Sequence, residues 1–432
     1  MSIRVGTTSR AVTSYGGAEL LRETARAVGL DEAVDRCVHL KQRARGLSEA
    51  EFVTSMAESI ALGARCLDDL AVTRADTAQS LLRGHEVPAP QTAGAWLRRF
   101  TLGHLCQLNK ALDVVVRNAF ALAGMKDVTL DFDSTYVFSR STRRQGVDRT
   151  YKKGYALHPL LCFEAGSGTA VHARLRRGRA GPSTGIASFV AETLRRVPGG
   201  VTVRARLDSG FYSGALFDQL ESAGVTYLCG APLIEPLLEA STAISPDFWA
   251  PCLDKEEGEV AEFGYRLRAR GAPFRRYVVK RIALDDGEQL SFEGGPFRYW
   301  IFVTNDHDHS AVELESEHRH KADVESGMRE LKSNFGLHAF RKHRFMVNWT
   351  WLLLVCLGHN LCCWTQQLGG LGAGRDGADL RAKRLRYRYL AIPAMVTRSG
   401  RRFTLRLQAG YPYLAQFVAT LRRLEALRAP PI

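Results

Sequence analysis

The hydrophobic period of the chain changes once, and this change restricts the fold more than any other feature. From residue 17 to about residue 120, apolar side chains recur at helical spacing with few strand signals. The segment Val128–Asp133 then alternates strictly, which places its apolar side chains on one face of a strand and Asp131 and Asp133 on the other. The sequence therefore predicts a helical N-terminal region followed by an α/β unit.

The order of the later elements predicts a mixed α/β core. We expect a hairpin over 156–164 and 169–175, a helix over 184–196, a strand over 201–208, a helix over 215–223 and a strand over 225–229. The strand over 201–208 ends on Asp208, and the glycine that follows at Gly210 allows a ligand or another backbone to approach closely. Strand-like pieces then predict a largely β insertion between residues 235 and 305.

The stretch His318–Gly336 predicts a single helix of about five turns. On such a helix His318, Lys321, Glu325 and Lys332 fall within an arc of roughly 60°. A carboxylate spaced by whole turns from cations can hold a divalent metal while its neighbours bind phosphates. A solvated helix with ordinary i,i+4 ion pairs is the alternative.

The charge of the chain indicates a polyanionic partner. Its 59 Lys and Arg residues exceed its 45 Asp and Glu residues, for a net charge of +14, and residues 375–432 hold 13 basic and 3 acidic residues. Tyrosine and phenylalanine are interleaved in this basic segment, so nucleic acid is the expected partner, with an anionic membrane surface as the rival.

Two short basic turns add to this expectation. Arg98 and Arg99 follow a predicted helix over 95–100, which can be the second helix of a helix-turn-helix unit or a packing element of a helical bundle. A second basic turn follows the predicted helix over 318–336. It contains three cations that we expect to bind DNA: Arg341, Lys342 and Arg344.

Cysteine usage and hydropathy favour a globular protein of a reducing compartment. The nine scattered cysteines make no paired zinc motif, so we expect free thiols. The N-terminus lacks the apolar region of a secretory signal. Asn348, His359 and Asn360 interrupt the apolar run over 345–364, which therefore predicts a buried helix rather than a membrane span.

Three carboxylates lie on successive predicted elements of the core: one on a strand, one at the end of a later strand, and one on a helix beyond an insertion. A sheet and a helix can bring such a triad together around two divalent metals. On these residues the sequence resembles a bacterial DDE transposase, most closely the insertion-sequence-1380 family. The matching segments are 29–34, 67–76, 130–135, 206–211 and the helix that carries Glu325.

The resemblance implies a ribonuclease H-like catalytic core, a mixed sheet flanked by helices, with a β-rich insertion and an N-terminal α-helical domain. It implies Asp133, Asp208 and Glu325 as the catalytic, metal-binding carboxylates, with Asp131 as the fallback for Asp133. The implied cofactor is a pair of Mg²⁺ ions, for which Mn²⁺ can substitute.

The family pattern Tyr-x2-Arg-x3-Glu-x6-Lys here places His318 and Lys321 where the family has Tyr and Arg. Both can donate to a phosphate, as can Lys332, but Lys321 lacks the bidentate fork of arginine. The resemblance also implies that Trp300, in the insertion, stacks on a flipped DNA base. A core tryptophan in a strand is the alternative.

The implied function is cut-and-paste transposition: binding of the terminal inverted repeats of an insertion sequence, followed by Mg-dependent end cleavage and strand transfer. The expected partner is double-stranded DNA, at transposon ends and target, bound by a homodimer in a synaptic complex. The expected place is the bacterial cytoplasm, at the nucleoid and without a membrane. A plain metal-dependent nuclease of the same fold and a catalytically silent DNA-binding derivative are the alternatives.

The pattern divides the chain into five parts. We expect an N-terminal helical DNA-binding region over 1–122, a first core segment over 123–234, the β-rich insertion over 235–308, a second core segment with the catalytic Glu helix over 309–367, and a Gly-rich linker with a basic C-terminal region over 368–432.

Overall fold

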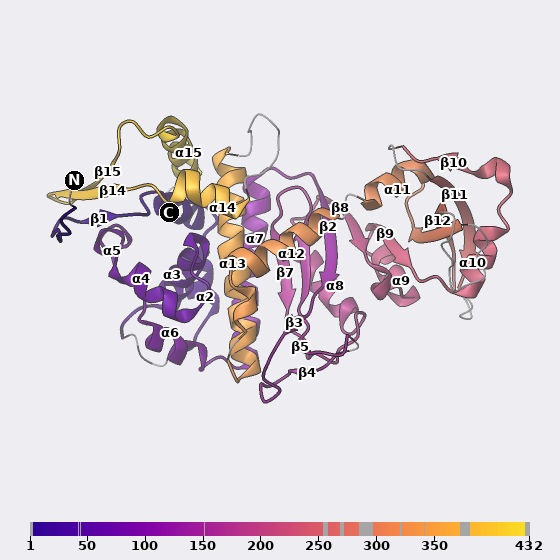
Figure 1. The fold of residues 1–432 in the computed structure, drawn as a ribbon, viewed down its shortest axis with the longest axis horizontal. Coiled ribbons are helices and arrows are strands. Elements are labelled where there is room, and N and C mark those ends of the chain that lie inside the picture. The colour runs from indigo at the N-terminus through magenta and orange to yellow at the C-terminus, as the bar shows by residue number, and fades with distance from the viewer. Residues whose placement is uncertain are drawn as a thin grey trace.

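The computed structural model describes residues 3–41, 43, 45–150, 152–253, 258–267, 272–284, 297–319, 322–340, 342–371 and 381–427. The molecule is elongated, with the N-terminal helices at one end, a sheet with its covering helices in the middle, and the β-rich insertion at the other end (Figure 1).

The N-terminal region is helical, as its apolar spacing predicts. Its helices are α1 (Ala18–Ala27), α2 (Leu30–Cys37), α3 (Glu49–Leu62), α4 (Leu70–Ala75), α5 (Thr77–Arg83), α6 (Pro90–Leu97) and α7 (Leu102–Leu122). A capping box starts α3, because the Ser48 hydroxyl accepts from the Glu51 amide and the Glu51 carboxylate accepts from the Ser48 amide. The helix predicted over 95–100 begins earlier, at Pro90, whose fixed φ suits a first helical turn.

The centre of the molecule is a nine-stranded mixed sheet in the order β10-β11-β12-β13-β9-β8-β2-β6-β7. The strands are β2 (Asp127–Ser134), β6 (Leu160–Glu164), β7 (Ala170–Arg174), β8 (Thr202–Leu207), β9 (Thr226–Ala231), β10 (Ala250–Pro251), β11 (Glu259–Arg266), β12 (Phe274–Ala283) and β13 (Phe297–Thr304). Strands β2, β8 and β9 are parallel, and β6 and β7 run antiparallel to their neighbours. The predicted fold class, with a ribonuclease H-like core, is confirmed.

Two sets of helices cover the two faces of the core sheet. Phe132 on β2 packs edge-on against Phe189 of α8 (Ile186–Leu194), which with α9 (Gly214–Ser222) covers one face. Phe163 on β6 packs against His359 of α13 (Phe345–Gly369) on the other face. Asp131 pairs with Phe163 across the strands, so Asp131 lies on the face that α13 covers.

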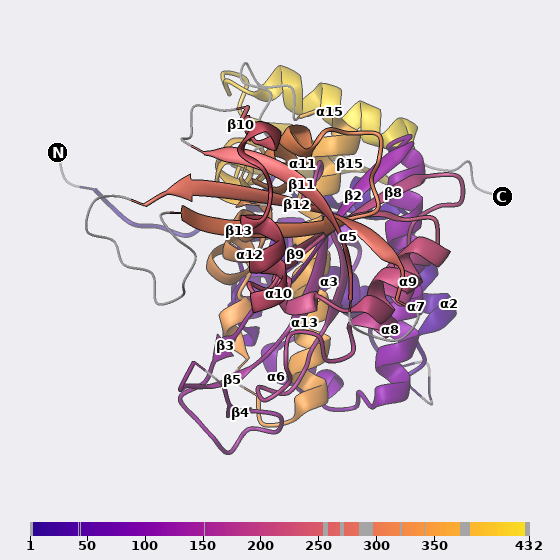
Figure 2. The ribbon, with the colours of Figure 1, turned by 90° about the vertical axis from the view of Figure 1, so that its right-hand side faces the viewer.

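The insertion extends the core sheet instead of forming a separate one. Strand β13 pairs antiparallel with β9 from Ile301↔Ala231 to Thr304↔Leu228, so the core hydrogen-bond ladder continues into β12 and β11 (Figure 2). Helix α10 (Glu235–Thr242) and helix α11 (Ala311–Arg319) pack against these strands. The predicted largely β insertion is confirmed.

The stretch His318–Gly336, predicted as one helix, is helical over most of its described residues. Helix α11 ends at Arg319 and helix α12 (Ala322–Asn334) follows, with residues 320–321 outside the described part. The two helices contact different parts of the sheet: Leu314 of α11 joins a small core with Val278 and Phe302 of the insertion, whereas Gly327 of α12 lies against Phe163 of β6. His318 lies on α11 and Glu325 on α12.

The long apolar helix is buried, as its interrupting polar residues predict. Among the described residues, α13 is the one helix that is long enough and apolar enough to cross a membrane. However, 83% of the apolar 18-residue stretch on which this rests is buried inside the protein. Asn360 accepts from the Ala170 amide at 2.8 Å, and His359 Nε2 lies 2.9 Å from the Gly168 carbonyl oxygen. The polar groups of the helix thus bind the end of the β6–β7 hairpin.

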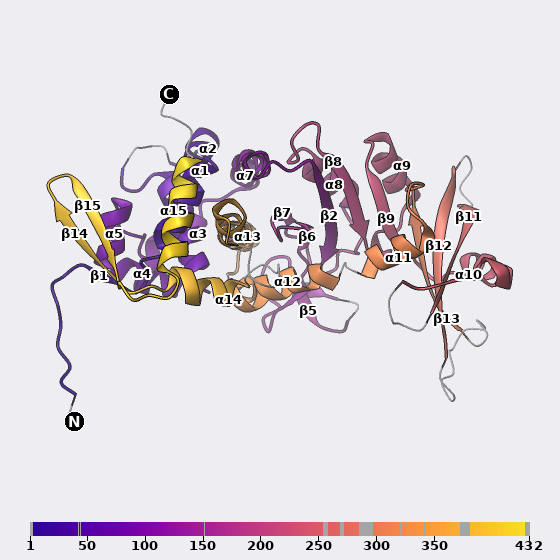
Figure 3. The same ribbon diagram turned by 90° about the horizontal axis from the view of Figure 1, so that it is seen from above.

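The C-terminal segment returns to the N-terminal helices. It contains α14 (Ala382–Leu385), a π-helical turn at Arg386–Leu390, β14 (Ala394–Ser399), β15 (Arg402–Leu407) and α15 (Leu414–Ala426). Strand β14 pairs with β1 (Val12–Thr13), and α15 lies along α1 and α13 (Figure 3). The β14–β15 hairpin projects at the end of the molecule opposite the insertion. All nine cysteines lie in the described part and are free thiols.

Candidate active site

Asp133 and Asp208 stand at the ends of neighbouring parallel strands. The β2–β8 register ends with Phe132 opposite Leu207, so the next residues along the two strands, Asp133 and Asp208, follow side by side. Both carboxylates line one cavity of about 1400 Å³. The turn after Asp208 is tight, because a Cβ at Gly210 would lie only 2.8 Å from Pro182 Cβ. The glycine thus lets the Pro182 side chain approach closely.

Asp131 has a different environment from Asp133. Its carboxylate is fully buried and accepts two hydrogen bonds from Arg206, from Nε and Nη2, each at 2.6 Å. Arg206 also donates to the Glu317 carbonyl oxygen at 3.1 Å. The residues alternate along each strand, so this ion pair lies one pleat behind Asp133 and Asp208 on the same sheet face. The charge of Asp131 is thus matched within the protein.

Helix α12 approaches this same face of the sheet. The Phe163 side chain is on the same face of the sheet as that of Asp131. A Cβ added at Gly327 would lie 3.3 Å from the Phe163 ring. Because Gly327 lacks a side chain, the helix can pack closely against this ring. The third predicted carboxylate, Glu325, belongs to α12 by its backbone, but its side chain lies outside the described residues.

Lys332 brings a cation from α12 to the end of β2. Its Nζ donates a hydrogen bond to Thr135 Oγ1, two residues beyond Asp133. Burial lowers the pKa of Lys332, while the nearby Asp133 carboxylate opposes this shift and the nearby Lys152 adds to it. The predicted companion Lys321 lies outside the described residues.

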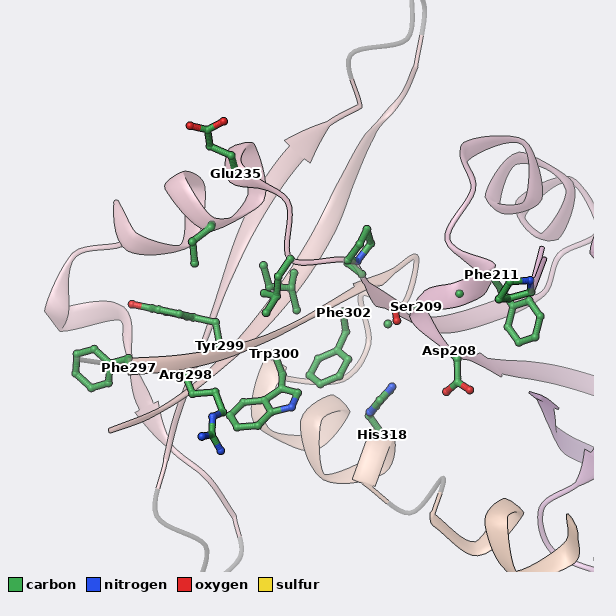
Figure 4. Close-up of a pocket in the computed structure, with 18 of the residues that line it drawn as sticks. Asp208, Ser209, Phe211, Glu235, Phe297, Arg298, Tyr299, Trp300, Phe302 and His318 are labelled. Carbon is green, nitrogen blue, oxygen red and sulfur yellow. The ribbon is translucent and has the colours of Figure 1, made fainter. Parts of the chain in front are cut away.

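The insertion forms the opposite wall of the cavity. Trp300 on β13 lines the cavity with 39% of its surface exposed, so its side chain is not part of the core. His318, at the end of α11, also lines the cavity and lies with its ring centroid 4.1 Å from that of Phe302. Figure 4 shows Asp208, His318 and Trp300 around the same open space. Four of the predicted site residues are therefore brought to one cavity.

A smaller pocket of about 200 Å³ adjoins the main cavity at Asp133. Its lining residues are Ser134, Thr135, Tyr136, Phe138, Lys152, His158, Pro182 and Lys332. Ser134, Lys152 and Pro182 line both spaces. Apart from Lys332, the sequence analysis did not select these residues for the site. The available signals were two aromatics directly after the strand and the Lys152–Lys153–Gly154 turn.

The two predicted basic turns meet on the surface. Arg344 Nη1 donates to the Arg98 carbonyl oxygen at 3.1 Å, and Arg98, Arg99, Lys342 and Arg344 are all exposed. Helix α6 itself packs inward, since its Trp96 is buried and stacked on Phe52. Arg341 lies outside the described residues.

The donor set suits a hard divalent cation. Two aspartate carboxylates open onto one cavity, and carboxylate oxygens are the ligands that Mg²⁺ and Mn²⁺ prefer. Among the side chains that the structure describes, no group of three His, Cys, Asp or Glu is gathered closely enough to hold a metal, and Glu325 is not among those side chains.

Comparison with known proteins gives a family and a structural neighbour. Residues 1–429 match the family model described as transposase DDE domain group 1. No curated protein matches the chain significantly. Among solved structures, the chain is similar to the piggyBac transposase in a synaptic complex with hairpin DNA, with 14% identity, a TM-score of 0.45, and coverage of 98% of this chain and 85% of that one.

Proposed function

The chain belongs to the transposase DDE domain group 1 family, and on this premise we propose that it cuts and joins the ends of a bacterial insertion sequence of the insertion-sequence-1380 type. It binds the terminal inverted repeats of the element, nicks the DNA at each end, and uses the freed 3′-hydroxyl for strand transfer. It works in the bacterial cytoplasm, as a homodimer in a synaptic complex.

One observation carries the proposal. Asp133 and Asp208 end adjacent parallel strands and open onto one cavity, while α12, which carries Glu325, packs against the same sheet face through Gly327. Positions 325 and 332 are seven residues apart on α12, so they share a helix face to within about 20°. Lys332 already reaches the end of β2, which supports Glu325 as the third carboxylate.

The site residues have distinct roles in this mechanism. Asp133, Asp208 and Glu325 hold two Mg²⁺ ions, which when bound activate the attacking water or 3′-hydroxyl and stabilise the leaving oxygen. The Asp131–Arg206 pair fixes the strands behind these carboxylates. His318, Lys321 and Lys332 position phosphates, and Trp300 stacks on a base flipped out of the duplex.

The duplex is held outside the cavity by basic surfaces. Arg98, Arg99, Arg341, Lys342 and Arg344 contact the backbone near the core. The β14–β15 hairpin supplies further exposed arginines at 398, 401, 402 and 406, on a segment packed against the N-terminal helices. We propose that this end of the molecule contacts the double-stranded DNA of the terminal repeat.

The test is cleavage and joining of DNA that carries the inverted repeats flanking the reading frame. Asp208→Asn and Glu325→Gln should lose cleavage in Mg²⁺ by several orders of magnitude and keep end binding, because the lost charge is at the metals. Glu239→Gln is the matched control, since Glu239 is an acidic residue of the same cavity on α10.

A pre-nicked end separates the possible activities. A transposase converts it to a joined product with target DNA, whereas a plain nuclease yields no joined product. Absence of both cleavage and joining by the unmodified protein on bound ends would identify a silent DNA-binding protein. Full cleavage by Glu325→Gln would remove Glu325 from the mechanism.

A further inference from the structure

The smaller pocket beside Asp133 combines aromatic rings with cations. It is smaller than the roughly 300–1,000 Å³ typical of pockets for whole small ligands, and its size suits the base of one nucleotide rather than a duplex. It adjoins the main cavity, with which it shares the lining residues Ser134, Lys152 and Pro182. A DNA strand whose phosphate lies at Asp133 would therefore have a neighbouring nucleotide at this pocket.

Two lysines line this pocket, the exposed Lys152 and the half-buried Lys332. No acidic residue is among the eight that line it. The nearest carboxylate that affects Lys332 is that of Asp133, in the adjoining cavity, and it raises the pKa of Lys332 against the effect of burial. A phosphodiester that contacts both lysines would accept charge-assisted hydrogen bonds from them.

The aromatic rings form a wall that is fixed from behind. Tyr136 stacks on His158 with ring centroids 4.0 Å apart, and Phe138 lies 6.0 Å from Tyr136. His158 is held at both ring nitrogens, 3.0 Å from Ser134 Oγ and 2.9 Å from the Ala180 carbonyl oxygen. Phe138 is nevertheless 58% exposed, so its ring is accessible to a ligand.

The turn that carries Lys152 is also specialised. Lys153 has a φ of +59°, the one non-glycine residue with positive φ in the described part of the chain. A Cβ at the next residue, Gly154, would lie 2.6 Å from the Phe138 ring, so this turn packs directly against the aromatic wall. A strained turn that brings a lysine to an exposed aromatic ring is a feature of binding sites rather than of ordinary loops.

We propose that this pocket binds one unpaired nucleotide adjacent to the cleaved phosphodiester, with its base stacked on Phe138 and its phosphate held by Lys152 and Lys332. The proposal deepens the proposed function and rests on it. The pocket lies on the β2 side of Asp133, whereas Trp300 lies across the main cavity on the insertion. The two aromatics would thus hold bases on different sides of the reacting phosphate.

The experiment uses the full chain and a short single-stranded oligonucleotide with one 2-aminopurine, because stacking on an aromatic ring is tolerant of sequence. Affinity is measured by fluorescence anisotropy, and stacking by quenching of the 2-aminopurine. Phe138→Ala should weaken binding about 5- to 150-fold and remove the quenching. Lys152→Ala should weaken binding and keep the quenching of the bound fraction.

Matched controls lie far from the pocket. Phe248→Ala removes an exposed phenylalanine from the insertion, and Lys110→Ala removes an exposed lysine from α7; both should leave quenching unchanged. Phe138→Leu keeps the apolar bulk without the ring, so its loss of quenching would show that stacking, not folding, is affected.

Unchanged affinity and quenching in Phe138→Ala would overturn the proposal. So would a shift of Phe138→Ala from dimer to monomer with unaltered quenching, since it would make the exposed ring a protein interface. These results are independent of the cleavage test. If the unmodified protein cuts DNA ends and Phe138→Ala binds the oligonucleotide normally, only the proposed pocket is refuted. If the unmodified protein does not cut DNA ends, the proposed function is refuted.

Discussion

Arg206 and Asp131 form a buried, two-pronged ion pair directly behind the candidate catalytic carboxylates. Both hydrogen bonds measure 2.6 Å, and the Asp131 side chain has no exposed surface. Asp131 and Asp133 look equivalent in the sequence, since they alternate onto the same strand face. Arg206 on β8 makes their environments different. It neutralises the Asp131 carboxylate inside the protein, whereas the Asp133 carboxylate opens onto the cavity.

Asp131→Asn should destabilise the fold, because it leaves the Arg206 charge buried without its partner. The expected loss is about 3–5 kcal/mol in the free energy of unfolding, measured by urea denaturation. Asp133→Asn should lose cleavage with little loss of stability. The double change Asp131→Leu with Arg206→Met should recover much of the stability, and a stable Asp131→Asn would contradict the structural role.

Gly327→Leu should push α12 away from the sheet, because the new side chain would meet the Phe163 ring. We expect a higher Mg²⁺ concentration for half-maximal cleavage, since Glu325 moves with the helix. Adding Phe163→Ala to Gly327→Leu removes the ring that the leucine would meet. The Mg²⁺ concentration for half-maximal cleavage should then return part of the way to that of the unmodified protein. A metal titration of cleavage checks this, and an unchanged midpoint in Gly327→Leu would speak against α12 as a source of the third ligand.

Trp300→Ala should weaken the binding of a DNA end with an unpaired terminal base by about 1 to 3 kcal/mol, the value of one stacked base. Trp300→Phe should retain much of the binding, because a ring remains. Phe248→Ala, which removes an exposed aromatic of the same insertion, is the control. Equal binding by all three variants would leave Trp300 without a stacking role.

His158→Gln should flatten the pH dependence of stability between about pH 6.5 and 4. Burial, with a further contribution from Arg176, lowers the pKa of His158 to about 4, whereas an unfolded histidine titrates near 6.5. Within that window the unfolded chain binds a proton that the folded chain does not, so the unmodified protein loses stability as the pH falls. Urea midpoints measured at pH 7.5, 6 and 5 test this; parallel curves for the two proteins would disprove it.

Replacing Arg401 and Arg402 by alanine should weaken duplex binding more at low salt than at high salt. Each lost phosphate contact lowers the slope of log affinity against log salt by about 0.9. Cleavage of a saturated complex should not change, because the hairpin lies at the end of the molecule opposite the insertion (Figure 3), whose residues line the cavity. Arg195→Ala, another exposed arginine, is the control, and an unaltered slope would remove the hairpin from the DNA contact.

Local patterns in the sequence were sufficient to predict most elements of the fold. The alternation of β2 and β8, the β-rich character of the insertion and the buried helix α13 all follow from hydrophobic period and turn residues. The positions of Asp133 and Asp208 at strand ends follow from the same patterns. Within the stretch predicted as a helix over 318–336, the described residues 318–319 and 322–334 are helical.

The sequence by itself determined which residues form strands and helices and which carboxylates end them, because side-chain period and chain-breaking residues act over a few positions. Only the tertiary structure decided that Arg206 neutralises Asp131, that Gly327 lets α12 approach Phe163, and that Lys332 joins Phe138 and Lys152 in one pocket. Each of these contacts joins segments distant in the chain, so it depends on strand register and packing, which no local pattern encodes.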